Sequence, residues 1–187
     1  MEIRFEQVGK QYHGHTVLER LDWQIRTGER WLIRGVSGRG KTTLLRLLTG
    51  LEPPSAGQIT GTENVRFSMC FQENRLCGKM SSVTNLAMVC PHPEPEKIRP
   101  LLLELLPEEA LDRPAGTLSG GMARRVALAR ALAAPSDAVI LDEPFAGLDE
   151  GTRAEALAFV ESHLAGRALV LVSHELPALA GAKVLRL

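Results

Sequence analysis

Residues 35–43 form a glycine-rich segment whose spacing fits a phosphate-binding loop. The pattern Gly35-x4-Gly40-Lys41-Thr42 follows an apolar run and precedes a leucine-rich window that predicts a helix. Glycines let the backbone curl so that several N–H groups face one anion, and the helix adds the positive end of its dipole. We expect Lys41 to reach the terminal phosphates of a nucleotide and the Thr42 hydroxyl to ligate Mg²⁺. The alternative, a glycine-rich turn that matches by chance, is disfavoured by the strand–loop–helix context.

An acidic pair follows a second apolar run. Residues 138–141 are continuously apolar and lead directly into Asp142 and Glu143. Short runs of this kind are typical of buried parallel strands, and open α/β sheets bind ligands at the carboxyl edge of such strands. We therefore expect Asp142 to lie beside the phosphate-binding loop and hold Mg²⁺ through its water shell. Glu143 could polarise a water for attack on the γ-phosphate. A solvated acidic loop is the alternative.

The composition excludes several classes of protein. The 187 residues predict one domain, or one domain with a subdomain, and 44% hydrophobic with 24% charged residues is typical of a globular chain. The 22 basic side chains balance the 22 acidic ones, so no excess positive field exists to attract a nucleic acid. No run approaches the about 18 apolar residues that a membrane-spanning helix needs.

Strand and helix patterns alternate along most of the chain. Alternating apolar residues predict strands within the first 35 residues, and fully apolar runs predict buried strands at 138–141 and 168–172. Helical periodicity covers 94–106, 121–133 and 151–164. This alternation predicts an α/β domain with a mostly parallel sheet. Residues 75–135 carry little strand signal and are interpreted as a helical insert.

The segment Leu118-Ser119-Gly120-Gly121-Met122 resembles the signature sequence of the ATP-binding cassette (ABC) ATPases. The resemblance extends over nearly the whole chain, with seven motifs in the family's order. Besides the signature they are the adenine-stacking aromatic Tyr12, the Walker A loop Gly35–Thr43, the Q-loop glutamine Gln72, the Walker B segment Ala138–Glu143, the D-loop Ala146–Asp149 and the switch histidine His174.

The resemblance implies a fold and a division of the chain. It implies a P-loop NTPase core with a mostly parallel sheet, an N-terminal antiparallel β-subdomain and an α-helical insert that carries the signature. Residues 1–187 would then be one ABC ATPase domain. The catalytic core would comprise residues 1–74 and 136–187, and the helical subdomain residues 75–135.

The same resemblance implies a set of site residues. Tyr12 would stack on adenine, although it could simply pack in a hairpin. The implied catalytic residues are Lys41, Gln72, Glu143 and His174, and the implied Mg²⁺ ligands are Thr42, Gln72 and Asp142. Asp149 would lie at a dimer interface. The other implied nucleotide-binding residues are Gly35, Ser37, Gly38, Arg39, Gly40, Thr43, Ser119, Gly120 and Gly121.

The implied activity is hydrolysis of ATP to ADP and phosphate, coupled to transport. Two cassettes of the family sandwich two ATP molecules head to tail, which implies a homodimer or heterodimer that closes on ATP. The implied partners are transmembrane permease subunits and a substrate-binding protein, and no nucleic acid. The chain would then be cytoplasmic and peripheral on the inner face of the cell membrane.

The resemblance is to compact bacterial importer cassettes of the nitrate, sulfonate and taurine type, and the solute stays open because cassettes do not touch it. A soluble, non-transport ABC ATPase is the alternative, but the long coiled coils or second cassette of those relatives are absent here. A small P-loop kinase would leave the signature and His174 unexplained. Met122 replaces the usual glutamine of the signature, and we expect function to survive because the phosphate contacts come from Ser119 and the glycines. Arg39 stands where serine is common in the family.

Overall fold

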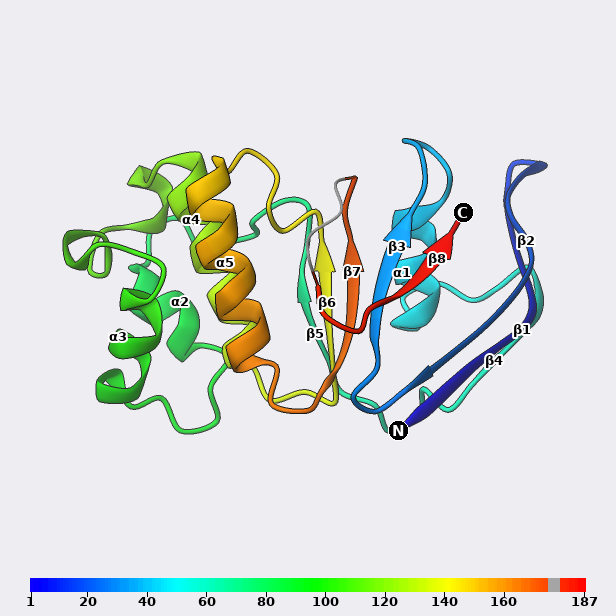
Figure 1. The fold of residues 1–187 in the computed structure, drawn as a ribbon, viewed down its shortest axis with the longest axis horizontal. Helices are drawn as coiled ribbons and strands as arrows, with labels where there is room; N and C mark the ends of the chain where they lie inside the picture. Colours follow the sequence, from blue (N-terminus) through cyan, green and yellow to red (C-terminus); the bar gives the residue numbers. More distant parts are fainter. Residues whose placement is uncertain (175–178) are drawn as a thin grey trace. The chain divides into compact units, whose positions relative to one another are not determined.

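The computed structural model describes residues 1–174 and 179–187 (Figure 1). Strands and helices alternate after an N-terminal set of strands, and glycine or proline residues occupy many of the connections. The strands are β1 Glu2–Tyr12, β2 His15–Arg26, β3 Arg30–Arg34, β4 Ala56–Thr60, β5 Phe67–Cys70, β6 Ala138–Asp142, β7 Ala168–Val172 and β8 Lys183–Arg186. The helices are α1 Lys41–Leu48, α2 Ser82–Ala87, α3 Pro95–Leu103, α4 Gly120–Ala133 and α5 Glu150–His163, with short 3₁₀ turns at Glu108–Ala110 and Ala115–Thr117.

Three strands near the N-terminus form an antiparallel sheet in the order β2-β1-β4. Phe5 of β1 lies opposite Trp23 of β2 and Ile59 of β4. The Phe5 and Trp23 rings have centroids 5.3 Å apart and are both buried. Because side chains alternate across a strand, these apolar residues share one face of the sheet. Strands β1 and β2 match the alternating pattern of the first 35 residues, whereas β3, in the same stretch, belongs to the second sheet.

A second sheet has five strands in the order β5-β6-β7-β3-β8. β3 pairs in parallel with β7 and with β8, so that Leu32 lies between Leu171 and Val184. Every residue of β6 and of β7 is buried. A strand covered on both faces is apolar at nearly every position, which explains why residues 138–141 and 168–172 read as continuous apolar runs.

Close contacts divide the chain into two compact units. Unit 1 contains residues 1–67, 136–140 and 166–187, and unit 2 contains residues 68–135 and 141–165. Unit 1 holds the antiparallel sheet, helix α1 and strands β3, β7 and β8. The boundary crosses β5 and β6, whose last residues belong to unit 2.

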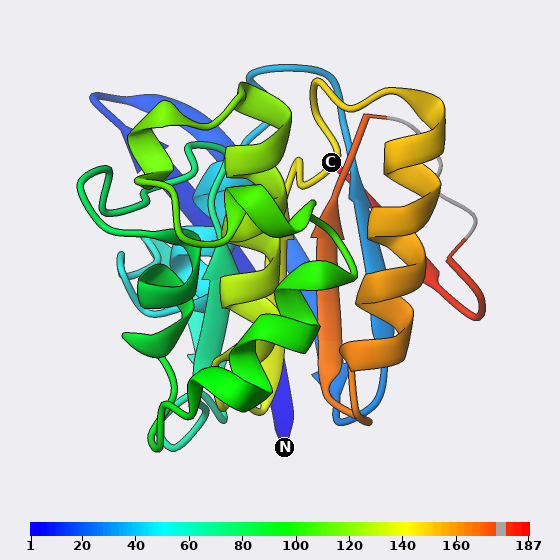
Figure 2. The same cartoon turned by 90° about the vertical axis from the view of Figure 1, so that its left-hand side faces the viewer.

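Unit 2 contains helices α2 to α5, and Figure 2 shows them from a second side, with α5 in orange. Half of the residues of α4 are buried, including Val126 and Leu128 at 0% exposure. The helix expected at 94–106 ends earlier than predicted, at Leu103. The N–H groups of Leu105 and Leu106 both donate to the Leu102 carbonyl oxygen, in a turn that follows the helix. The helix does not continue because helical backbone is disfavoured at Leu106, the residue before Pro107.

None of the helices within residues 1–174 and 179–187 combines the length and the apolar character needed to span a bilayer.

Candidate functional site

The loop after β3 is built around glycines with left-handed backbone. Gly38 has φ +81° and Gly40 has φ +86°, values that L side chains rarely adopt. A Cβ added at Gly40 would lie 2.8 Å from Cγ1 of Val17 and 3.1 Å from Cδ2 of Leu18, so the close approach of these β2 side chains also favours glycine there. Gly40 is the N-cap of α1 and offers no side-chain cap. The N–H groups at the start of α1 are therefore open to an anion.

Lys41, the first residue of α1, folds its side chain back over this loop. Its Nζ atom donates hydrogen bonds to the carbonyl oxygens of Gly35, at 2.7 Å, and Val36, at 3.3 Å. The next residue, Thr42, is exposed. The loop thus offers backbone N–H groups, the Lys41 ammonium and the hydroxyl of the exposed Thr42. This combination fits a nucleotide phosphate with its Mg²⁺, because Mg²⁺ prefers few protein ligands together with phosphate oxygens.

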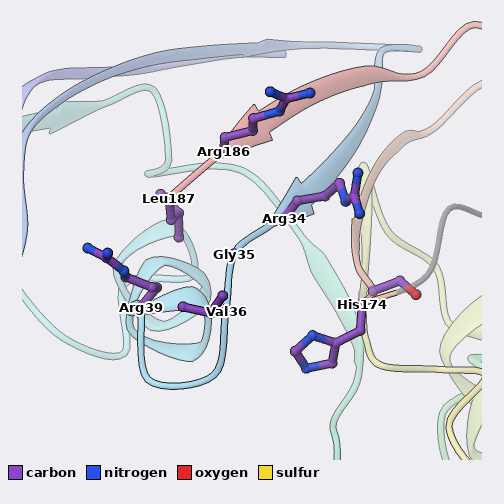
Figure 3. Close-up of a pocket in the computed structure, with 8 residues that line it drawn as sticks. Arg34, Gly35, Val36, Arg39, His174, Arg186 and Leu187 are labelled. Atoms are coloured by element: carbon purple, nitrogen blue, oxygen red, sulfur yellow. The ribbon is translucent and has the colours of Figure 1, made fainter.

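A cavity of about 400 Å³ opens beside the loop in unit 1 (Figure 3). Gly35 and Val36 of the loop line it together with Ser173 and His174, which follow β7. In Figure 3 the His174 ring points toward the side of the loop that carries Val36. The parallel pairing of β3 with β7 brings the ends of both strands, and hence these residues, to one edge. The remaining lining residues are Arg34, Arg39, Arg186 and Leu187, three of them cationic.

Tyr12, at the end of β1, is half-buried and held from two sides. Its hydroxyl donates a hydrogen bond to the Glu52 carboxylate, and the Lys10 ammonium lies 5.1 Å from its ring centroid. Glu52 also pairs with Lys10 at 3.3 Å and with Arg46 at 3.1 Å. The hydrogen bond from Tyr12, with the two cations, lowers the pKa of the Glu52 carboxyl. This network fixes the orientation of the ring.

The acidic pair lies in unit 2, at the end of β6. Asp142 is only 5% exposed, and Glu143 is half-buried. Glu143 has φ +49°, a left-handed conformation that is uncommon for a residue with a side chain. Gln72, two residues after β5, is exposed. This conformation turns the backbone directly after the last residue of β6.

Arg124, in the middle of α4, connects the two segments that carry these residues. It donates hydrogen bonds to the carbonyl oxygens of Gln72, at 3.1 Å, Asp142, at 2.6 Å, and Glu143, at 2.5 Å. Sequence reasoning missed this residue. A signal was present, because Arg124 shares a helix face with the buried residues 127, 128 and 131, where an arginine is unexpected.

The signature segment forms the start of α4. Ser119 is the N-cap, and its Oγ atom accepts a hydrogen bond from the Met122 N–H at 3.2 Å. Its own hydroxyl proton remains available to donate. Gly120 is exposed, and a Cβ built there would meet nothing within 4 Å. The helix start is therefore open on the side of Gly120.

Asp149 caps the start of α5. Its carboxylate accepts hydrogen bonds from the Thr152 N–H, at 3.0 Å, and from the Thr152 hydroxyl, at 2.8 Å. The backbone N–H of Thr152 lowers the pKa of this carboxyl because it stabilises the charged form. The family resemblance implies that Asp149 lies at a dimer interface, and the structure adds this local capping role.

The site residues expected from the sequence thus fall into two groups, one in each unit. In unit 1, Gly35, Val36 and Arg39 of the loop line one cavity with His174, and Tyr12 ends β1. In unit 2, Arg124 joins Gln72 to residues 142–143, and Ser119 starts the same helix. Among the described residues, no cluster of three or more His, Cys, Asp or Glu side chains could hold a metal by itself.

A parallel sheet whose strand β3 runs through a glycine loop into a helix defines the P-loop class of nucleotide-binding domains. The family model described as "ABC transporter" matches residues 18–146, which is more than half of the chain. The chain belongs to the ABC transporter family, as its ATP-hydrolysing cassette.

Two relatives illustrate the sequence similarity. An aliphatic sulfonates import ATP-binding protein of Nocardia farcinica is 39% identical over 170 residues, which cover 89% of this chain and 69% of that protein. A cytochrome c biogenesis ATP-binding export protein of Roseobacter denitrificans is 37% identical over 162 residues, covering 86% of this chain and 78% of that protein. These identities confirm the family that the motifs indicated.

Solved structures confirm the expected fold. The ATP-binding cassette MJ0796 in its dimeric, post-hydrolysis state bound to ADP and Pi superposes with a TM-score of 0.81 at 23% identity. The match covers 92% of this chain and 88% of that chain. The predicted combination of parallel sheet, N-terminal antiparallel sheet and helices is therefore correct.

Proposed function

We propose that this chain hydrolyses ATP to drive the import of a small solute through separate membrane subunits. The observation that carries the proposal is the phosphate-binding loop of unit 1, with Lys41 folded over it, in a chain 39% identical to a sulfonate importer cassette. The family membership supplies the ATPase activity. The direction of transport and the identity of the partner subunits are what we propose beyond this activity.

Nucleotide binding is assigned to the loop and its neighbours. The N–H groups at the start of α1 and the Lys41 ammonium bind the phosphates, and the Lys41 contacts to Gly35 and Val36 exchange for phosphate oxygens. The Tyr12 ring, oriented by Glu52, stacks on the base. The remaining loop residues, Ser37, Gly38, Arg39, Gly40 and Thr43, surround the phosphates.

We assign the Mg²⁺ ligands to Thr42, Gln72 and Asp142, as the motifs of the family imply. An exposed hydroxyl, an exposed amide oxygen and a carboxylate at a strand end are oxygen donors, which Mg²⁺ prefers. When bound, the ion neutralises charge that develops on the phosphate oxygens.

Glu143 is assigned as the group that orients the attacking water and accepts its proton, and His174 contacts the γ-phosphate. The half-buried position of Glu143 at a sharp bend and the aim of the His174 ring toward the loop support these roles. A base of this kind contributes typically about 10²–10⁴-fold to a rate.

A second cassette completes each site in this proposal. Ser119, Gly120 and Gly121 start a helix with open N–H groups and a free hydroxyl proton, which suits the γ-phosphate bound by a second copy or a homologous chain. Asp149 lies at the interface between the two cassettes. Homodimer and heterodimer both satisfy this arrangement.

The proposed partners are transmembrane permease subunits and a substrate-binding protein, which place the chain on the inner face of the cell membrane. The balanced charge of the chain gives no reason for a nucleic-acid partner. The names of several relatives, for aliphatic sulfonates, sulfate or thiosulfate and ferric ions, refer to import. These names favour a small, charged solute.

The experiment uses cells that lack the chain and are complemented with the wild type or with Lys41→Ala. Uptake of a radiolabelled aliphatic sulfonate should return with the wild type and stay at background with the variant. Efflux of a preloaded compound would instead support an exporter of the cytochrome c biogenesis kind, for which one relative is named. Unchanged uptake in the deletion cells would contradict the proposed import.

A further inference from the structure

The guanidinium of Arg124 is almost completely enclosed, with only 4% of the residue exposed. Each of its three nitrogen atoms donates to a protein oxygen. Nη1 bonds the carbonyls of Phe71 and Gln72, at 2.5 and 3.1 Å, and Oδ1 of Asn74 at 3.2 Å. The acceptors are neutral oxygens of a single short segment after β5.

The other edge of the same guanidinium holds the end of β6. Nη2 donates to the carbonyl oxygens of Asp142, at 2.6 Å, and Glu143, at 2.5 Å, and Nε donates to that of Pro144, at 3.2 Å. Three consecutive carbonyls therefore point at one side chain. These carbonyls provide hydrogen-bond acceptors for the N–H groups of the buried guanidinium. Such acceptors are needed because a charged group removed from water is costly unless its donors are hydrogen-bonded.

The backbone held in this way is strained. Glu143 adopts φ +49°, and a residue with a side chain keeps such a conformation only when its surroundings over-determine it. The bonds from Arg124 to the carbonyls on both sides of the Glu143 N–Cα bond supply that constraint. They thereby fix the direction in which the Glu143 side chain leaves the backbone.

We infer that Arg124 is a positioning residue that fixes the aim of Glu143 and, through the same guanidinium, the backbone of Gln72. Because Arg124 lies on the helix that begins at Ser119, it ties the signature segment to the hydrolytic carboxylate. A displacement of α4 is transmitted to residues 142–144 through these bonds. The inference rests on the proposed role of Glu143.

Neighbouring arginines of α4 do not share this arrangement. Arg130 donates to the carbonyl oxygens of Asn74 and Arg75, at 3.1 and 2.9 Å, on the segment after β5. Arg125 is half-buried and donates to the carbonyl oxygen of Leu105. Arg125 is thus a control on the same helix, because its replacement also removes a hydrogen bond to a backbone carbonyl but no bond to residues 142–144.

The test compares Arg124→Gln, Arg124→Lys and Arg125→Gln for steady-state ATP hydrolysis, equilibrium ATP binding and thermal unfolding. Arg124→Gln should lower kcat by about 10–100-fold, since a misplacement near 1 Å at a reacting group costs about 10²-fold. KM and the ATP Kd should change by less than about threefold, because the P-loop is untouched. Arg124→Lys should have a kcat between those of the wild type and Arg124→Gln, because a lysine ammonium keeps the charge but cannot bond all the carbonyls that the planar guanidinium reaches.

A merely structural role gives a different result. The kcat per folded molecule would then stay at the wild-type value in Arg124→Gln, or would fall equally in Arg125→Gln, and either outcome overturns the inference. If Arg124→Gln does not fold, the kcat of Arg124→Lys per folded molecule tests the inference instead. A wild-type kcat in Arg124→Lys would then overturn it.

Glu143→Gln and the double variant Arg124→Gln/Glu143→Gln separate this inference from the proposed function. When Arg124 acts through Glu143, the double variant hydrolyses ATP in a single turnover no more slowly than Glu143→Gln alone. A further loss of tenfold or more in the double variant overturns the inference. Normal turnover by Glu143→Gln would contradict the proposed role of Glu143 itself.

Discussion

The ammonium of Lys41 donates a hydrogen bond of 2.7 Å to the carbonyl oxygen of Gly35, six residues earlier and across the phosphate-binding loop. The lysine is therefore already oriented toward the centre of the loop. A ligand phosphate replaces carbonyl oxygens with charged ones, which strengthens the interaction.

Lys41→Ala should lower ATP affinity by about 10–100-fold, because a hydrogen bond to a charged group contributes about 1.5–3 kcal/mol. Isothermal titration of the purified chain with ATP and Mg²⁺ measures this change. Lys183→Ala is a suitable control, because Lys183 pairs with Glu29 at 2.6 Å on β8. Equal affinity in the wild type and Lys41→Ala would show that the loop does not bind the phosphates through this residue.

Gly40→Ala should destabilise the chain more than Gly14→Ala does. Both glycines have positive φ, +86° and +82°, so both substitutions strain the backbone. Only at Gly40 does the new Cβ meet Val17, at 2.8 Å, whereas Gly14 has nothing within 4 Å. We expect an additional loss of about 1–3 kcal/mol, the usual cost of overpacking, in urea unfolding. Equal losses at the two sites would contradict the packing argument.

Ser119 allows its capping role and its proposed phosphate contact to be separated. Aspartate caps a helix as well as serine does, whereas alanine costs about 1 kcal/mol. Ser119→Asp should therefore keep the wild-type unfolding free energy but abolish ATP-dependent dimerisation, because its charge repels the phosphates. Ser119→Ala should be less stable. Light scattering with ATP measures the dimer, and a Ser119→Asp dimer of normal strength would contradict the shared site.

Asp149 predicts a pH dependence of stability. Its folded pKa lies below the ordinary value of 3.8, chiefly because the Thr152 N–H bonds the carboxylate. The stabilisation is therefore fully present above the unfolded pKa and is lost as the pH falls from about 4 through the folded pKa. Asp149→Asn caps the helix with a neutral side chain and should therefore lack this pH-dependent part of the unfolding free energy. Urea unfolding at pH 6 and pH 3 should show a smaller loss on acidification for Asp149→Asn than for wild type; equal losses would contradict it.

Local patterns were sufficient to predict the loop after β3 and the buried strand β6. A glycine spacing and a run of apolar residues each report on their own backbone, whatever lies elsewhere in the chain. The same reasoning extended the helix at Pro95–Leu103 too far, because Leu105 and Leu106 continue the apolar pattern. Both are buried, but they lie in a turn before Pro107.

The role of Arg124 could not be predicted in this way. Its acceptors lie about 50 residues before it and about 20 residues after it in the chain. An arginine in a helix is usually exposed, so its type alone predicts a solvated side chain. The short helix α2, Ser82–Ala87, was not separately predicted either, because six residues are too few for a helical period to stand out.

The central claim, that Glu143 activates the water that attacks ATP, is tested most directly by the turnover of Glu143→Gln. The amide keeps the size of the side chain but cannot accept the proton, so ATP binding should stay within about threefold of wild type. Turnover should fall by about 10²–10⁴-fold, the usual contribution of a general base. Glu150→Gln, seven residues later, is the control. Wild-type turnover by Glu143→Gln would contradict the account.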